Sequence, residues 1–141
     1  MTTTTTTATG TAKFTSWAED PAFDGDAPLP RLAHATVSFE YEGDLAGSSS
    51  CRYVLSYGAD GHGTAVGFEE LTGSLGGVPG TIVLRHEASF GESGVTTRWS
   101  VVAGAGTGGL ADVRGEGDYE ASHGSSGWAY RLDYHGAGSG K

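Results

Sequence analysis

The sequence predicts a single all-β domain, a closed antiparallel barrel of about eight strands. The length of 141 residues suits one domain with its own hydrophobic core. Apolar and polar residues alternate in short runs, as in half-buried strands, and no stretch shows the period of a helix. The 25 glycines fall between these runs and indicate turns. A regular strand spacing of about ten residues favours a closed meander, with a β-sandwich as the alternative.

The alternation predicts eight strands, at residues 11–18, 31–42, 51–57, 64–72, 81–90, 95–103, 116–122 and 128–135. A proline-rich loop over 20–30 follows the first strand, and a glycine-rich connection over 104–115 precedes the seventh. In the second strand five alternate residues share one face: Ala33, Ala35, Val37, Phe39 and Tyr41. Residues 10–135 are assigned to the barrel, residues 1–9 to a disordered threonine-rich tail and residues 136–141 to a flexible C-terminal tail.

Composition narrows the expected partners. The chain has 17 acidic and 8 basic residues, a net charge of −9, which argues against nucleic acid and against an anionic membrane surface. A small, largely apolar molecule is the expected partner. With Cys51 as the single cysteine, an intrachain disulfide is excluded, and this residue is expected to be a small buried apolar group. Without a secretory signal or a run of about 20 apolar residues, a cytoplasmic location is expected.

The sequence carries no cofactor fingerprint and no metal-ligand spacing, so we expect neither a cofactor nor a metal. The glycine-rich run over 104–109 lacks the lysine of a P-loop and is expected to be a connection between strands.

Three hairpins define a register. Asp60–Gly61 is a favoured two-residue turn and would place Arg52 opposite Glu69. A Gly76–Gly77 turn would place Glu69 opposite Leu84, and a loop over 91–94 would place His86 opposite Trp99. One face then carries Arg52, Glu69, Ile82, Leu84, His86 and Trp99. This face should point inward, because the other face of the fifth strand carries charged residues. If the fourth strand is flipped, Glu70 replaces Glu69.

Glu69 and His86 are the candidate catalytic residues. A carboxylate and an imidazole close together in a partly apolar barrel are suited to proton transfer. The alternative is purely structural: Arg52 and Glu69 form a satisfied ion pair, and His86 packs edge-on against Trp99.

Small residues and aromatic residues predict a ligand cavity. Four small residues share the predicted inner face and leave room for a ligand: Ser56, Ala65, Gly67 and Ala88. The candidate ligand contacts are Arg52, Trp99, Tyr53, Trp17 and Phe39. In the same register the outer face is strongly apolar, through Tyr53, Leu55, Tyr57, Val66 and Phe68, so we expect a homodimer or a higher homo-oligomer.

Several segments together resemble a known family. The segments "TSWAEDP", "YVLSYGADG", "VGFEELTGSLGG", "IVLRHEASF" and "GAGTGGLADVRGEG" are similar to those of a bacterial family of unknown function, in the same order from Gly10 to Tyr134. The resemblance implies an eight-stranded antiparallel barrel shaped like that of the allene oxide cyclases. It implies no activity, and no active-site residue of the plant cyclases can be matched here.

Two functions remain open. One is a binding module that holds a small, largely apolar molecule, as lipocalin-like barrels do. The other is a cofactor-independent cyclase or isomerase, acting on a polyketide-like or oxylipin-like intermediate, in which Glu69 or His86 moves a proton.

Overall fold

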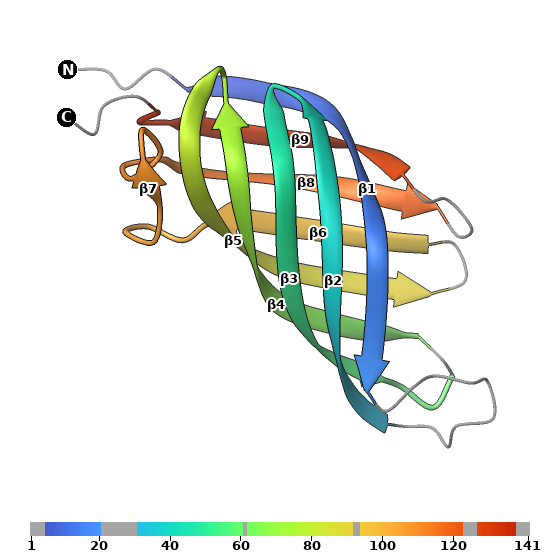
Figure 1. The fold of residues 1–141 in the computed structure, drawn as a ribbon. Coiled ribbons are helices and arrows are strands. Elements are labelled where there is room, and N and C mark those ends of the chain that lie inside the picture. The colour runs from blue at the N-terminus through green and yellow to red at the C-terminus, as the bar shows by residue number, and fades with distance from the viewer. Residues whose placement is uncertain (1–4, 21–30, 61, 92–93, 123–126, 138–141) are drawn as a thin grey trace.

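In the computed structural model, which describes residues 5–20, 31–60, 62–91, 94–122 and 127–137, the chain forms a closed antiparallel barrel (Figure 1). The strands are β1 (Thr6–Asp20), β2 (Arg31–Gly43), β3 (Leu45–Tyr57), β4 (Gly63–Leu75), β5 (Val78–Gly91), β6 (Gly94–Val101), β7 (Thr107–Gly108), β8 (Arg114–Ser122) and β9 (Gly127–His135). Eight of them close a ring in the order β1-β2-β3-β4-β5-β6-β8-β9, and β7 pairs outside the ring with β5. The predicted barrel is confirmed.

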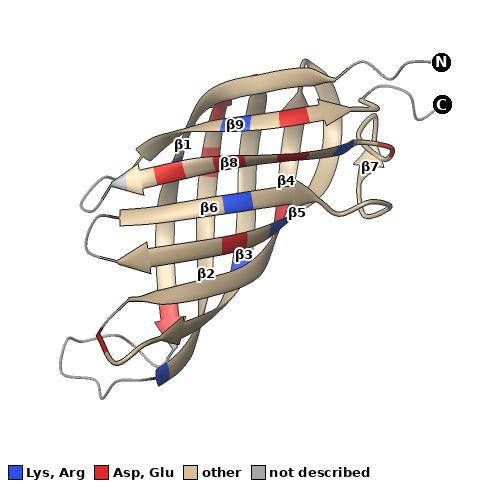
Figure 2. Cartoon of the chain, turned by 180° about the vertical axis from the view of Figure 1, so that it is seen from behind, with Lys and Arg blue, Asp and Glu red and all other residues tan. Residues whose placement is uncertain are grey.

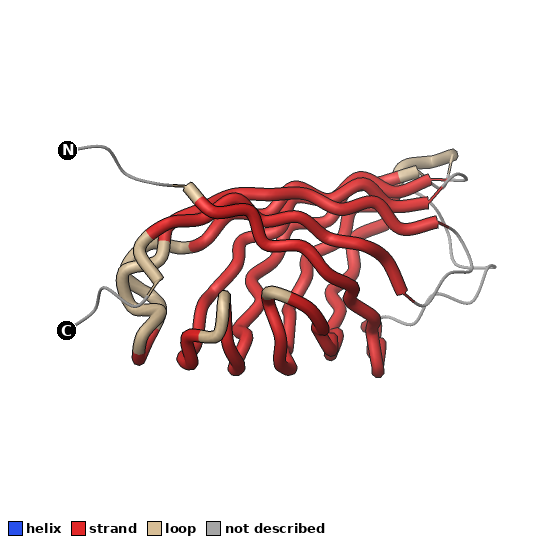
Figure 3. The backbone as a smooth tube through the Cα atoms, turned by 90° about the horizontal axis from the view of Figure 1, so that it is seen from above, coloured by secondary structure: helices blue, strands red, loops and turns tan. Residues whose placement is uncertain are grey.

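The strands cross steeply on opposite sides of the barrel. In Figure 1, β2, β3 and β4 run across β6, β8 and β9, as strands tilted to a barrel axis do. Figure 3 shows from above that strands make up most of the described chain and that loops and turns join them. The described residues contain no helix that is long and apolar enough to cross a membrane.

The strands are longer than the alternation predicts. β1 already begins at Thr6, where it pairs with β9, so residues 6–9 belong to the barrel and not to a disordered tail. Residues 1–4 and 138–141, the outer parts of the two predicted tails, lie outside the described residues, as does most of the proline-rich loop. The glycine-rich connection contributes the short β7.

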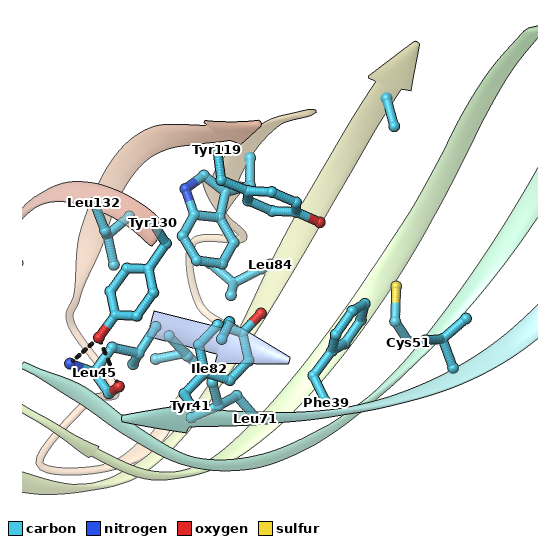
Figure 4. Close-up of a cluster of buried hydrophobic side chains, with 14 of the residues drawn as sticks. Phe39, Tyr41, Leu45, Cys51, Leu71, Ile82, Leu84, Tyr119, Tyr130 and Leu132 are labelled. Carbon is cyan, nitrogen blue, oxygen red and sulfur yellow. Dashed lines mark hydrogen bonds between the residues drawn. The ribbon is translucent and has the colours of Figure 1, made fainter. Parts of the chain in front are cut away.

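Leucine and isoleucine side chains close the end of the barrel that lies beside both termini. Each is at most 1% exposed: Leu45, Leu71, Leu75, Ile82, Leu84, Leu110 and Leu132. Figure 4 shows Tyr130 pointing from β9 toward Leu45, whose backbone N–H and C=O both bond to the Tyr130 hydroxyl, at 2.9 and 2.8 Å. Since burying one such side chain is worth about 1.5–3 kcal/mol, this layer is a main source of stability.

The prediction that alternate residues of the second strand share one face is confirmed, and this face points inward, because all five are buried: Ala33, Ala35, Val37, Phe39 and Tyr41. Two of the three predicted hairpin registers are also confirmed. Glu69 lies opposite Leu84, and His86 lies opposite Trp99.

The predicted β3–β4 register is wrong by one residue. Tyr57 pairs with Gly63 because the connection has an odd length, from Gly58 to His62. The N–H of Gly58 donates to the carbonyl of His62 at 2.7 Å, and the Asp60 carboxylate accepts from the N–H of His62 at 3.0 Å. Asp60 therefore caps a longer loop instead of occupying a two-residue turn.

This shift exchanges the two faces of β3. Tyr53, Leu55 and Tyr57 are buried inside, whereas Arg52 and Ser56 are exposed outside, contrary to the prediction. The outer apolar patch therefore differs from the predicted one. It consists of four exposed residues, with the exposed fraction of each in parentheses: Leu32 (71%), Val54 (63%), Val66 (43%) and Phe68 (53%). Self-association through this face stays a prediction.

Opposite charges alternate across the outside of β6, β8 and β9 (Figure 2). Arg98 pairs in the ladder with Asp118, and Asp118 pairs with Arg131. A shallow hollow of about 540 Å³ lies over these residues. Such opposite-charge neighbours stabilise adjacent strands by about 0.2–1 kcal/mol each.

Candidate functional site

Glu69 and His86 meet at the centre of the barrel. Their strands are adjacent, and the two residues are diagonal neighbours in the β4–β5 ladder. His86 Nε2 lies 2.5 Å from Glu69 Oε1, and both side chains are 0% exposed. The predicted pair therefore exists, but it lies within the barrel core and has no direct contact with solvent.

The Glu69 carboxylate is fully hydrogen-bonded. Its Oε2 accepts from the Tyr41 hydroxyl at 2.7 Å and from the Ser49 hydroxyl, and its Oε1 faces His86. A carboxylate that accepts three hydrogen bonds has no proton to donate, so the proton between the two residues is assigned to Nε2 of His86. The other ring nitrogen, Nδ1, then carries no proton and is a hydrogen-bond acceptor.

Two phenols converge on His86 Nδ1. The Tyr53 hydroxyl lies 3.2 Å away and the Tyr119 hydroxyl 3.4 Å away. The Tyr53 ring reaches this position by crossing Gly67, where a Cβ atom would lie 2.9 Å from the ring. Glycine at this position therefore allows the contact between Tyr53 and His86 across β4.

Aromatic rings hold the imidazole in place. The ring of Phe39 stacks parallel to that of His86 with centroids 6.4 Å apart, and Trp99 meets it edge-on at 5.9 Å. The edge-on contact with Trp99 is the one that the structural alternative predicts. The Trp99 indole N–H donates to the carbonyl of Arg131 at 3.0 Å, so its only polar atom is already bonded within the protein.

Burial also keeps the surrounding phenols protonated. The loss of hydration raises the pKa of Tyr41 well above its ordinary value, and the neighbouring Glu69 charge adds to the effect. Burial likewise raises the pKa of Tyr53 and of Tyr119. These hydroxyls are therefore neutral hydrogen-bond donors at physiological pH. Burial raises the pKa of Cys51 as well, so this thiol stays protonated.

A β-bulge in β1 builds the other end of the barrel. The pairing with β2 shifts between Phe14 and Ser16, so Phe14 lies opposite Phe39 and Trp17 lies opposite Val37. Directly paired residues share a face of the sheet, so both aromatic residues point inward. Without the extra residue in β1, Phe14 and Trp17 would lie on opposite faces.

These two inward-facing residues are nevertheless exposed. Phe14 is 40% exposed and Trp17 is 46% exposed, whereas the leucines at the other end are almost completely buried. The ring centroids of Phe14 and Trp128 lie 6.1 Å apart. Trp17 stacks on Tyr53, with ring centroids 6.2 Å apart and an angle of 25° between the ring planes. We call this end, bounded by Phe14, Trp17, Tyr53 and Trp128, the mouth.

Small side chains line part of the inner face near the mouth. Several inward positions of β2, β4 and β5 near this end carry alanine: Ala33, Ala35, Ala65 and Ala88. Phe90, however, ends the same face of β5 and packs against Tyr57. At the closed end, the same faces of β4 and β5 carry Leu71, Leu75, Ile82 and Leu84. Of the four small residues predicted on the inner face, Ala65, Gly67 and Ala88 are buried there, and Ser56 is exposed outside.

Glu19 forms a polar cluster at the rim of the mouth. Its carboxylate accepts from Arg31 at 2.8 Å, from the Tyr57 hydroxyl at 2.8 and 3.0 Å, and from the Trp17 indole N–H at 3.2 Å. Burial, followed by the hydrogen bond to Glu19, raises the pKa of Tyr57 to about 12. The cluster joins the end of β1 to the start of β2 and fixes the orientation of Trp17.

The structure thus brings together most of the predicted site residues. Glu69, His86, Trp99, Tyr53 and Phe39 lie inside the barrel, and Trp17 lies at its mouth. Arg52 is the exception, because the shifted register places it on the outer face opposite Phe68. The predicted contact between Arg52 and Glu69 is wrong.

Four residues of the network were not singled out from the sequence: Glu19, Tyr41, Ser49 and Tyr119. For Tyr41 the signal was present, since it lies on the predicted inner face of the second strand. For Glu19 there was none, because its direction depends on the bulge. Among the described residues, no group of three His, Cys, Asp or Glu side chains is placed to hold a metal ion.

Comparison with known proteins agrees with this fold. A family model described as "Protein of unknown function (DUF3224)" matches residues 8–134. The crystal structure of a protein of unknown function from the DUF3224 family of Shewanella oneidensis MR-1 is similar at 20% sequence identity, with a TM-score of 0.76 over 93% of this chain and 96% of that chain. At this identity the similarity shows the fold alone. No curated protein matches the chain.

The family model spans most of the chain and confirms the resemblance to a bacterial family of unknown function with a β-barrel. The chain therefore belongs to the DUF3224 family.

Proposed function

We propose that the protein binds a small, largely apolar molecule in the mouth of the barrel. The observation that carries this proposal is the exposure of two inward-facing aromatic residues, Phe14 at 40% and Trp17 at 46%. Aromatic side chains inside a barrel are ordinarily covered by neighbouring side chains, so their exposed faces offer apolar surface to an occupant.

The polar groups around the mouth favour a neutral ligand. Glu19 and Arg31 neutralise each other at the rim, with side chains 8 and 10% exposed. The Tyr53 and Tyr119 hydroxyls beneath the mouth are uncharged, because burial raises the pKa of each. A neutral planar molecule can stack on Trp17 without the desolvation cost of a charged group.

Binding can be tested with N-phenyl-1-naphthylamine, a neutral probe whose fluorescence increases in apolar surroundings. We expect saturable binding to the protein and about a tenfold rise in Kd for Trp17→Ala, which removes an aromatic contact worth about 1.4 kcal/mol. Phe68→Ala is the matched control, since Phe68 is an exposed aromatic residue of the outer patch. If Phe68→Ala weakens binding and Trp17→Ala does not, the probe binds outside the barrel and the proposal is wrong.

A second candidate is a cofactor-independent cyclase or isomerase, acting on a polyketide-like or oxylipin-like intermediate. One observation favours it: the buried pair of Glu69 and His86 is connected to the mouth through Tyr53. A buried carboxylate bonded to a neutral imidazole seldom increases stability over apolar packing, so its presence needs another reason. A Glu69→Gln variant that still binds ligand but no longer converts it would support the enzyme, whereas unchanged conversion would exclude Glu69 from the chemistry.

A further inference from the structure

We propose that Tyr53 exchanges a proton with a bound, enolisable carbonyl compound, and that His86 accepts or returns this proton from behind. The inference rests on the proposed binding function, and it names both the reacting residue and the class of substrate. Tyr53 is then the catalytic residue, while His86 and Glu69 act through it as positioning residues.

The position of Tyr53 between mouth and core supports this role. On its mouth side the ring stacks on the half-exposed Trp17 at 6.2 Å. On its core side the hydroxyl lies 3.2 Å from Nδ1 of His86. Tyr53 is 5% exposed, whereas Glu69 and His86 are 0% exposed. The Tyr53 ring therefore lies between Trp17 and His86, and a molecule must pass the edge of Trp17 to reach the Tyr53 hydroxyl.

The network can transfer one proton with its charges balanced. The C–H bond next to the carbonyl breaks, its proton moves to the Tyr53 oxygen, and its electron pair forms the enolate. At the same time the Tyr53 hydroxyl proton moves to Nδ1 of His86. The resulting imidazolium donates through Nε2 to the Glu69 carboxylate, which lies 2.5 Å away. The reverse transfer protonates the enolate and restores neutral His86.

The chemistry of the surrounding groups selects the substrate class. A relay of this kind needs a carbon acid that an imidazole can deprotonate with help, and a C–H bond beside a carbonyl is such an acid. The Tyr119 hydroxyl, 3.4 Å from the same Nδ1, is a second neutral donor beside Tyr53 that would stabilise an enolate oxygen at this position. The aromatic walls favour a ketone joined to a planar apolar ring.

The test uses 2-tetralone, a neutral bicyclic aromatic ketone. Exchange of its α-protons in deuterated water is followed by NMR, and its Kd is measured in parallel by quenching of tryptophan fluorescence. We expect the protein to accelerate exchange over buffer by about 100-fold or more. Tyr53→Phe should abolish this acceleration while raising Kd by at most about tenfold, the effect of one lost hydrogen bond.

Glu69→Gln should likewise abolish the acceleration and leave the Kd within about threefold of the original value, since Glu69 does not touch the ligand. This separation of rate from affinity is not expected of a purely structural role. Tyr134→Phe, which removes a phenol at the closed end, is the control and should retain full exchange.

Each remaining outcome decides the matter. If 2-tetralone binds but exchange stays at the buffer rate, or if Tyr53→Phe exchanges as fast as the unmodified protein, the proton relay is excluded and the binding function stands. If neither 2-tetralone nor N-phenyl-1-naphthylamine binds, the proposed function fails, and the relay that rests on it fails too.

Discussion

Replacing Glu69 by glutamine should reverse the tautomer of His86 while leaving the barrel folded. The glutamine carbonyl oxygen can still accept from Tyr41 and Ser49, which contact Oε2 in the native protein. The amide nitrogen then takes the place of Oε1 and faces Nε2 of His86. Because two N–H groups cannot bond to each other, Nε2 must lose its proton and accept, and Nδ1 must carry the proton.

The expected energetic cost is small because the number of hydrogen bonds is preserved. Nδ1–H can donate to the Tyr53 hydroxyl, which lies 3.2 Å away. The three charge-assisted bonds to the carboxylate become neutral, but a buried charge also disappears, so we expect the free energy of unfolding to fall by only about 1–2 kcal/mol. Glu69→Ala instead leaves the Tyr41, Ser49 and His86 donors unsatisfied and should cost about 3–5 kcal/mol.

Two measurements check this reasoning. Long-range proton–nitrogen NMR correlations of the imidazole identify the protonated nitrogen, which should be Nε2 in the native protein and Nδ1 in Glu69→Gln. Urea denaturation gives the stabilities, and Glu70→Gln, on the exposed face of β4, is the matched control with no expected change. A Glu69→Gln protein that keeps Nε2–H, or that loses as much stability as Glu69→Ala, would refute the assigned hydrogen-bond directions.

Three further outcomes are expected. Burial raises the pKa of five of the six tyrosines above the ordinary value of 10: Tyr41, Tyr53, Tyr57, Tyr119 and Tyr130. In Tyr134→Phe, absorbance at 295 nm should therefore show little phenolate near pH 10 and should rise only as the barrel unfolds. The stabilising contribution of these five phenols is fully present below pH 10 and is lost as the pH rises through their folded-state pKa values. Early phenolate formation without unfolding, as judged by circular dichroism, would contradict this burial. Tyr130→Phe should lower the free energy of unfolding by about 1–3 kcal/mol, because the buried N–H of Leu45 loses its acceptor, whereas Leu32→Ala on the exposed outer patch should change it by less than about 0.5 kcal/mol. Glu19→Gln should lower the melting temperature and make Trp17 more accessible to acrylamide quenching, and an unchanged quenching constant would show that Glu19 does not hold the indole.

Much of the barrel could be predicted because strand alternation and turn chemistry are local. The Gly76–Gly77 turn, in which both glycines have a positive φ, determines the β4–β5 register. Gly94 closes the next hairpin in the same way. The diagonal proximity of Glu69 and His86 follows from the Gly76–Gly77 turn alone, which is why the centre of the site could be found from the sequence.

The error at Arg52 has an equally local cause. Asp60–Gly61 favours a two-residue turn, but the Asp60 side chain caps His62 instead, and the loop gains odd length. Because side chains alternate with a period of two, the one-residue shift in the β3–β4 register turns Tyr53 inward and Arg52 outward. Local turn preferences cannot settle such a competition, since the burial of Tyr53, Leu55 and Tyr57 contributes to the outcome.

The mouth could not be predicted at all from strand patterns, because it depends on a bulge. Alternation places Phe14 and Trp17 on opposite faces of β1, and the extra residue between Phe14 and Ser16 brings them to one face. This arrangement leaves apolar surface exposed inside the barrel, where filling it with the closed-end pattern of leucines would bury more area and increase stability. The loss of this burial, together with the hydrogen bond by which Glu19 orients Trp17, supports the proposal that a molecule binds in the mouth.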